Sequence, residues 1–174
     1  GQVQVLDVAD PAAAEQAVLA ATAELLESAN SGHPSLVAAG GGAIDVEVHH
    51  LPARDGDPVG AMVVVHLVVD VADAMGANAI NSMCERIAPR IAELTGGRVG
   101  LRILSNLADR RTVTARGRVP LAVLAGRGCD TPEELARGIV EASVFAERDP
   151  YRAATHNKGI MNGIDSVLLA FGQD

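Results

Sequence analysis

The sequence is short of aromatic residues: Phe, Trp and Tyr make up 2% of its 174 residues, and tryptophan is absent. Apolar residues nevertheless account for 48% of the chain. The core must therefore be built from the side chains of Ala, Val, Ile, Leu and Met. A chain of this length is long enough to bury such a core in one domain, or in one domain and part of another.

Clustered positive charge and long apolar runs are also missing. The net charge is −8, and no basic block occurs. Nucleic-acid binding depends on clustered Lys and Arg, so we expect no nucleic-acid partner. The longest apolar run, residues 60–69, contains His66 and is too short to span a bilayer. With no signal peptide either, we expect no membrane partner.

The two cysteines, Cys84 and Cys129, lie far apart and have no metal-ligand spacing. This usage favours a reducing, cytoplasmic compartment and predicts no metal site. The chain begins at Gly1 without a methionine and stops at Asp174 without a tail. We expect it to be a fragment of a longer protein.

Hydrophobic periodicity predicts an α+β fold for the first two thirds of the chain. Residues 2–8 and 98–107 alternate as strands, as do residues 44–48 with Ile44, Val46 and Val48 inward, whereas residues 62–71 are apolar on both faces. Helical patterns cover residues 10–31 and 78–95. The turn at residues 54–58 favours a hairpin. The resulting βαββαβ order is the split ferredoxin-like arrangement.

Residues 109–174 are predicted to form a second unit. Residues 108–124 interleave arginines with apolar residues, which predicts a strand or strand pair. Thr131 and Glu134 form a capping box that opens a helix running to about Arg148. Residues 152–165, RAATHNKGIMNGID, then form a polar stretch that is atypical of a core helix.

Lys158 stands between Asn157 and Gly159 in this stretch. Glycine allows the backbone to approach a ligand closely, and a lysine held against a polarised carbonyl places a cation where negative charge develops. The simpler interpretation is a helix start with a solvated lysine. The residue types alone leave both interpretations open.

Residues 73–78, DAMGAN, lie where a strand gives way to a helix. Backbone N–H groups after Gly76 can face a phosphate, assisted by the helix dipole. Asp73 can accept a hydrogen bond from a sugar hydroxyl or hold the turn. On this stretch alone, a structural turn is the simpler interpretation.

Three motifs together resemble one known family. Residues 73–81, DAMGANAIN, resemble the cofactor loop of hydroxymethylglutaryl-CoA (HMG-CoA) reductases. Residues 155–163, THNKGIMNG, resemble the lysine motif of the bacterial class, class II, and residues 101–107, LRILSNL, are also similar to that class. The motifs occur in the family's order and the similarity extends over the whole chain, so the chain resembles a central fragment of such an enzyme.

The resemblance implies an NAD(P)H-dependent oxidoreductase of the mevalonate pathway. Two hydride transfers would convert HMG-CoA to mevalonate and free CoA, or the reverse. A small ferredoxin-like domain would bind the cofactor, here residues 1–108, and a larger domain would bind the thioester, here in part residues 109–174. The family implies a cytoplasmic homodimer, or a higher homo-oligomer, with its active site at a dimer interface.

The resemblance also assigns site residues. Lys158 matches the catalytic lysine that stabilises the oxyanion, and Asp174 matches the aspartate that hydrogen-bonds this lysine and favours its charged form. Arg152 matches the arginine that binds the substrate carboxylate. Asn162 and Asn106 match polar residues near the substrate and the nicotinamide. The cofactor loop comprises Asp73, Met75, Gly76, Ala77 and Asn78.

Two catalytic residues of the family have no match in this chain. The family's catalytic glutamate lies in a motif upstream of it and the CoA-protonating histidine in one downstream, so we expect this fragment alone to be inactive. His156 belongs to the lysine motif and does not replace that histidine. The remaining histidines are expected to be ordinary strand or loop residues, namely His33, His49, His50 and His66.

The cofactor choice is predicted from residues 32–34, which read Gly-His-Pro. NADH-using relatives carry an acidic residue at the matching place, just after the first helix, where it bonds the ribose hydroxyl and repels a phosphate. Its absence here favours NADPH over NADH. No arginine lies near this place in the sequence to support the choice.

Two other functional classes stay open on the sequence. A non-enzymatic ferredoxin-like module for small ligands would account for residues 1–107 but not for the lysine cluster that follows. A structural oligomerisation piece would predict that Lys158→Ala leaves turnover intact. NAD(P)H binding separates the first alternative from the enzyme, and the lysine substitution separates the second.

Overall fold

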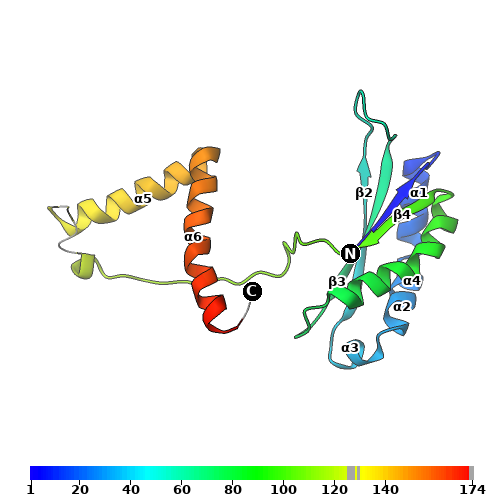
Figure 1. Ribbon diagram of the computed structural model, residues 1–174, viewed down its shortest axis with the longest axis horizontal. Helices are drawn as coiled ribbons and strands as arrows, with labels where there is room; N and C mark the ends of the chain where they lie inside the picture. The colour runs from blue at the N-terminus through cyan, green and yellow to red at the C-terminus, as the bar shows by residue number, and fades with distance from the viewer. Residues whose placement is uncertain (125–127, 129, 173–174) are drawn as a thin grey trace. The chain divides into compact units, whose positions relative to one another are not determined.

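The computed structural model describes residues 1–124, 128 and 130–172. The chain divides into two compact units, Gly1–Thr112 and Val113–Asp174 (Figure 1). Each unit is described separately below.

A four-stranded sheet forms the centre of the first unit. Its strands stand in the order β2-β3-β1-β4, and each neighbouring pair is antiparallel. The predicted hairpin, the central place of the doubly apolar strand β3 and the α+β class are confirmed. The strands are β1 (Gln2–Leu6), β2 (Gly42–Leu51), β3 (Met62–Asp70) and β4 (Arg98–Ile103).

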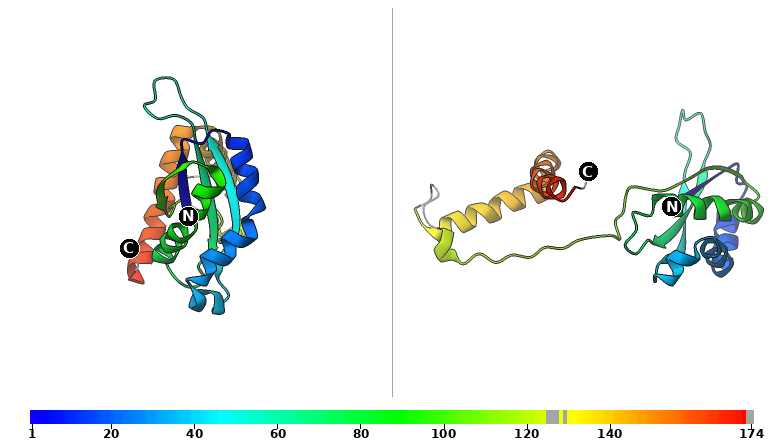
Figure 2. Two further views of the ribbon diagram at one scale, coloured as in Figure 1. Left: turned by 90° about the vertical axis from the view of Figure 1, so that its right-hand side faces the viewer. Right: turned by 60° about the horizontal axis from the view of Figure 1, so that its bottom comes forward.

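Helices cover one face of this sheet (Figure 1, Figure 2). They are α1 (Pro11–Ala20), α2 (Thr22–Ser31), the short α3 (Pro34–Ala38) and α4 (Ala77–Thr95). The single helix predicted over residues 10–31 is wrong in one respect, because it breaks at Ala21, whose ψ of 8° departs from helical geometry. The break leaves Val18 of α1 and Leu25 of α2 both fully buried.

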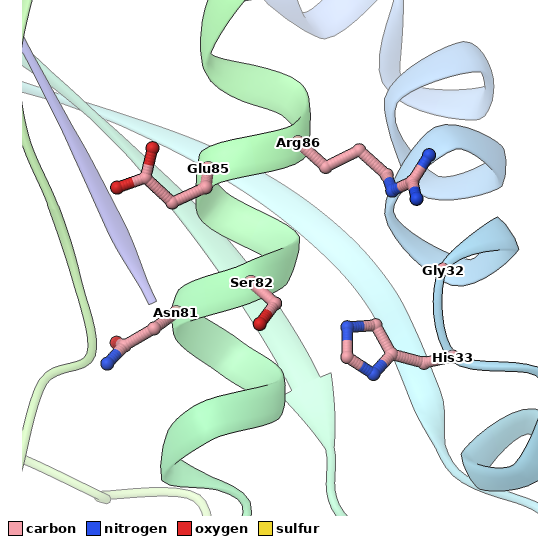
Figure 3. Close-up of a pocket in the computed structure, with 6 residues that line it drawn as sticks. All are labelled: Gly32, His33, Asn81, Ser82, Glu85 and Arg86. Atoms are coloured by element: carbon pink, nitrogen blue, oxygen red, sulfur yellow. The ribbon is translucent and has the colours of Figure 1, made fainter.

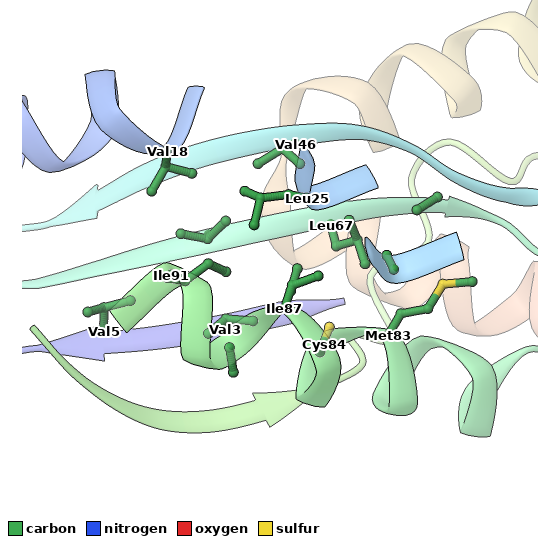
Figure 4. Close-up of a cluster of buried hydrophobic side chains, with 14 of the residues drawn as sticks. Val3, Val5, Val18, Leu25, Val46, Leu67, Met83, Cys84, Ile87 and Ile91 are labelled. Carbon is green, nitrogen blue, oxygen red and sulfur yellow. The ribbon is translucent and has the colours of Figure 1, made fainter. Parts of the chain in front are cut away.

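The core lies between the sheet and these helices and is aliphatic, as the composition predicts. Figure 4 shows side chains from β1, β2 and β3 meeting those from α1, α2 and α4. Its fully buried members include Val3, Val5, Val63, Val65, Leu67, Val18, Leu25, Met83, Ile87 and Ile91. No polar or charged side chain of the described residues is buried, so hydrophobic burial is the main stabilising term of this unit.

Two β-bulges change the predicted strand faces. In β2 the register shifts between Ala43 and Asp45, so Ile44, predicted to face inward, is 59% exposed. In β4, Arg102 pairs with Val3 and Val99 pairs with Val5, so a two-residue advance along β1 corresponds to a three-residue advance along β4. The extra residue re-aims the strand, and the predicted strand ends early, at Ile103.

The second unit consists of a 3-10 turn (η1, Leu121–Leu124) and two helices, α5 (Pro132–Arg148) and α6 (Pro150–Ala170). The predicted strand at residues 108–124 is wrong: residues 108–120 form neither a strand nor a helix, and residues 121–124 form η1. Thr131 Oγ accepts a hydrogen bond from Glu134 N at 3.2 Å, as the capping box predicts. No described helix is both long and apolar enough to cross a membrane.

The polar stretch of residues 152–165 lies inside α6. Asp149 ends α5 and also caps α6, because its carboxylate accepts a hydrogen bond from Arg152 N at 2.6 Å. The sequence predicts that this stretch is too polar for a core helix, and almost the whole of α6 is exposed in this chain. A polar helix needs no buried stripe on an exposed surface.

Asp10→Ala is expected to cost about 1 kcal/mol of the free energy of unfolding. Asp10 caps α1 by accepting hydrogen bonds from Ala12 N at 3.1 Å and Ala13 N at 3.0 Å. Urea unfolding of the full-length protein measures the loss. Asp55→Ala, in the exposed hairpin turn, is the matched control and should change the value by less than about 0.5 kcal/mol; equal effects would show that the cap contributes nothing.

Candidate functional site

The predicted cofactor loop follows β3 and is held in a strained conformation. Ala72 has a φ of 48°, a region that alanine rarely adopts. Its N–H donates to Asp70 Oδ1 at 2.9 Å, which holds the turn. Backbone strain of about 1–3 kcal/mol persists only where the surroundings enforce it, and it is frequent at ligand sites.

Gly76 is the N-cap of α4 and has a φ of 85°. A β-carbon at this position would stand 2.3 Å from Cγ1 of Val71, so both the backbone angle and the space require glycine. No side chain caps the helix. The first N–H groups of α4, including those of Ala77 and Asn78, therefore keep donor capacity, and with the helix dipole they suit an anion.

The side chains of this loop are available to a ligand. Asp73 and Asn78 are exposed, and Met75 is 85% exposed. The carboxylate of Asp73 is a hydrogen-bond acceptor only, so it can bind a ligand group that donates, such as a hydroxyl. The loop thus offers donors for a phosphate and an acceptor for a sugar.

The segment containing Asn106 is fastened close to this loop. Leu104 N donates to Asn81 Oδ1 on α4 at 2.8 Å, and Arg111 Nη1 donates to Ala74 O at 3.3 Å. The structure therefore brings together two segments that the sequence predicts separately. Arg111 was not predicted as a site residue, because only the fold places its cation beside the loop.

A second arginine holds the same segment against the sheet. Arg110 pairs with Glu47 of β2, and this hydrogen bond lowers the pKa of the Glu47 carboxyl. Because Arg110 is exposed and Glu47 is only partly buried, we expect the pair to position the segment rather than to add much stability.

A hollow of about 610 Å³ lies along α4, beyond the loop (Figure 3). It is lined by Gly32, His33, Asn81, Ser82, Glu85 and Arg86. From the sequence, residues 32–34 bore on the cofactor choice only because they contain no acidic residue, and no arginine lies near them in the sequence. The fold corrects this, because a methyl group on Gly32 would stand 2.9 Å from Nε of Arg86.

The other predicted site residues lie in the second unit. Lys158 and Asn162 are four residues apart on α6 and share a helix face, while Arg152 lies in the first turn of the same helix. All three side chains are exposed in this chain, and a β-carbon at Gly159 would meet nothing within 4 Å. Asp174, the predicted partner of Lys158, lies outside the described residues.

The arrangement of donors in the first unit suits nucleotide binding. No group of three His, Cys, Asp or Glu side chains in the described ranges is placed to hold a metal ion. The loop and the hollow instead supply N–H donors and cations, which are the groups that bind phosphates.

Comparison with known proteins identifies relatives over the whole chain. A family model described as "Hydroxymethylglutaryl-coenzyme A reductase" matches residues 1–174. A 3-hydroxy-3-methylglutaryl-coenzyme A reductase of Archaeoglobus fulgidus is 49% identical over 175 residues, which cover 100% of this chain and 38% of that protein. A probable enzyme of the same name from Borreliella burgdorferi is 40% identical over 113 residues, covering 63% of this chain and 25% of that protein.

Solved structures give the same result. A 3-hydroxy-3-methylglutaryl-coenzyme A reductase from Streptococcus pneumoniae superposes with a TM-score of 0.87 at 46% identity, covering 99% of this chain and 40% of that one. The class II reductase from the same organism, bound to NADPH in open conformations, has a TM-score of 0.87 at 46% identity and is covered to 45%. The chain thus spans less than half the length of these relatives.

Proposed function

Because the chain belongs to the hydroxymethylglutaryl-coenzyme A reductase family, we propose that its parent protein reduces HMG-CoA to mevalonate and CoA with NADPH. The observation that carries the proposal is the family match over residues 1–174. The alternative of a non-enzymatic ferredoxin-like module is not supported by these relatives. Since the chain covers 38% of the archaeal relative, the activity is proposed for the whole protein.

NADPH, when bound, supplies a hydride for each of the two reduction steps. In the first step the thioester carbonyl oxygen becomes negative, and the carbon–sulfur bond then breaks to give an aldehyde and CoA thiolate, which takes up a proton. In the second step the resulting aldehyde oxygen becomes negative and is protonated to give the alcohol. A fixed cation near this oxygen lowers the barrier to both steps.

Lys158 is the proposed cation. Its ammonium group would donate a hydrogen bond to the oxygen as charge develops there, and Asp174 would keep the lysine charged. Arg152 would bind the free carboxylate of the substrate with its planar fork, and Asn162 would position the substrate. The shared face of Lys158 and Asn162 on α6 supports their acting on one ligand.

The loop after β3 is proposed to bind the cofactor. Its uncapped helix start and its glycine at positive φ fit a pyrophosphate. We assign Asp73, Met75, Gly76, Ala77, Asn78 and Asn106 to this role. Residues 1–108 would then be the cofactor domain and residues 109–174 part of the substrate domain.

NADPH is proposed over NADH for two reasons. Residues 32–34 carry no acid that would repel a phosphate. A similar reductase from Streptococcus pneumoniae is described as bound to NADPH.

We also propose a cytoplasmic homodimer. Several apolar side chains of α6 are exposed in the single chain, including Ile160, Ile164, Val167 and Leu169. Exposed apolar surface of this extent is typical of a region covered in the complete assembly. Cys84 is a buried free thiol, which fits a reducing compartment.

An assay of the full-length protein tests the proposed function. We expect HMG-CoA-dependent loss of NADPH absorbance, with two NADPH consumed per mevalonate formed. The 174-residue chain alone should show no turnover. Binding of NADPH by the full-length protein without any turnover would favour the ligand-binding module instead.

A further inference from the structure

One face of α4 carries a polar stripe that starts at the cofactor loop. Asn78, Ser82 and Arg86 are spaced four residues apart, so they lie above one another on the helix. The opposite face is buried in the core through residues such as Met83 and Ile87. Ser82 Oγ donates to Asn78 O at 2.9 Å, so the stripe continues directly from the loop.

The stripe runs along α4 from the cofactor loop to Arg86. Gly76 and Arg86 are separated by about 15 Å along the axis, at about 1.5 Å per residue. Side chains on a helix lean back toward its N-terminus, so the guanidinium of Arg86 is expected to lie closer to the loop than its own Cα. A nucleotide with its pyrophosphate at Gly76 can therefore extend its adenosine half toward Arg86.

The opposite wall of the hollow comes from the connection between α2 and α3. Figure 3 shows the imidazole of His33 pointing toward Ser82, while the side chain of Arg86 extends toward Gly32. The hollow therefore presents a guanidinium, a ring nitrogen and a hydroxyl from two elements, and all three can bind an anion.

Arg86 differs from its neighbours in having no acidic partner in the described part of the chain. Arg90, one turn further along the stripe, binds Glu24 at 2.8 Å and Glu93 at 3.0 Å. Glu85 lines the hollow, but it pairs with Arg102 at 2.9 Å and points away from Arg86 (Figure 3).

An unneutralised cation is notable in a chain of net charge −8. An anionic ligand needs a local positive charge to approach such a protein. Arg86 supplies that charge beside Gly32, in a segment, residues 32–34, that carries no acid.

We propose that Arg86, assisted by His33, binds the 2′-phosphate of NADPH in this hollow and so determines the preference for NADPH over NADH. The inference rests on the proposed function, since it needs a dinucleotide with its pyrophosphate at the start of α4. Arg86 offers a planar pair of N–H donors to the phosphate oxygens. Gly32 leaves space for this guanidinium, because the β-carbon of any larger residue would crowd it.

Arg86→Gln in the full-length protein tests the inference. We expect the KM for NADPH to rise by about 10- to 100-fold, the range of a lost hydrogen bond to a charged group, with kcat within about twofold. The KM for NADH should stay within about twofold, because NADH has no phosphate at this position. Calorimetry should show that the affinity for 2′,5′-ADP falls toward that for 5′-AMP, whose own affinity is unchanged. Arg86→Lys should retain part of the effect.

Arg90→Gln is the matched control, because it removes the same charge from the same helix face one turn away. It should change the KM for NADPH by less than about twofold, since Arg90 is already neutralised by two glutamates. Equal losses with both cofactors in Arg86→Gln, or equal effects of the two substitutions, would overturn the inference. An enzyme that oxidises no NADPH with HMG-CoA would overturn the proposed function and this inference together, whereas NADPH oxidation unaffected by Arg86→Gln overturns the inference alone.

Discussion

Lys158→Ala in the full-length protein is expected to lower kcat by about 100- to 1,000-fold, the range for removal of one oxyanion donor. The negative oxygen exists in the transition state and not in the bound thioester. An interaction made only there affects kcat more than binding. We therefore expect the KM for HMG-CoA to change by less than about threefold. Steady-state kinetics with saturating NADPH measures both constants.

The identity of this cation supports the prediction. Lys158 is the only lysine among the 14 basic residues of the chain. Arginine replaces lysine poorly where a compact ammonium group must fit, so Lys158→Arg should recover little of the activity.

Arg137→Ala is the control for charge alone. Arg137 is an exposed cation on α5 of the same unit, and its removal should leave kcat within about twofold. If Lys158→Ala and Arg137→Ala behaved alike, Lys158 would be a solvated surface lysine, as the simpler interpretation of its motif holds.

The elements with strong periodicity were predictable from the sequence. Residues 62–71 are apolar on both faces, and β3 lies between β2 and β1. The stripe of α4 is buried at Met83, Ile87 and Ile91. In both cases a side-chain pattern repeated over several turns or steps decides which face packs on the core.

Features set by long-range contacts were not predictable. The bulge beside Ile44 arises from pairing with β3, and the break at Ala21 lets α1 and α2 each follow the sheet. The strand predicted at residues 108–124 does not form for a related reason. An alternating pattern forms a strand only where a partner strand is present, and the sequence does not show whether one is.

Some residues of the candidate site were likewise predictable from the sequence, and others were not. Its motif residues were identified by resemblance, since Asp73–Asn78 and Lys158 stand in short contiguous runs. Arg111 and Arg86 were missed because they reach the loop and Gly32 only through folding. The four-residue spacing of Asn78, Ser82 and Arg86 is the sequence signal that would have pointed to Arg86.

Gly76→Ala is expected to lower the free energy of unfolding by about 2–5 kcal/mol and to weaken NADPH binding strongly. Two costs combine. Alanine at a φ of 85° costs about 1–2 kcal/mol. Its methyl group would also stand 2.3 Å from Cγ1 of Val71, and such overpacking costs about 1–3 kcal/mol. Relieving the contact would shift the start of α4, where the pyrophosphate is proposed to bind.

Gly96→Ala separates the two costs. Gly96 ends α4 with a φ of 63°, but a β-carbon there meets nothing within 4 Å. It should lose only the backbone contribution, about 1–2 kcal/mol, and should leave the KM for NADPH unchanged. Urea unfolding and NADPH titration of both full-length variants make the comparison. If Gly76→Ala proved no more costly than Gly96→Ala and bound NADPH normally, the loop would be able to relax, and the close packing of Gly76 on Val71 would not be what holds the nucleotide site in shape.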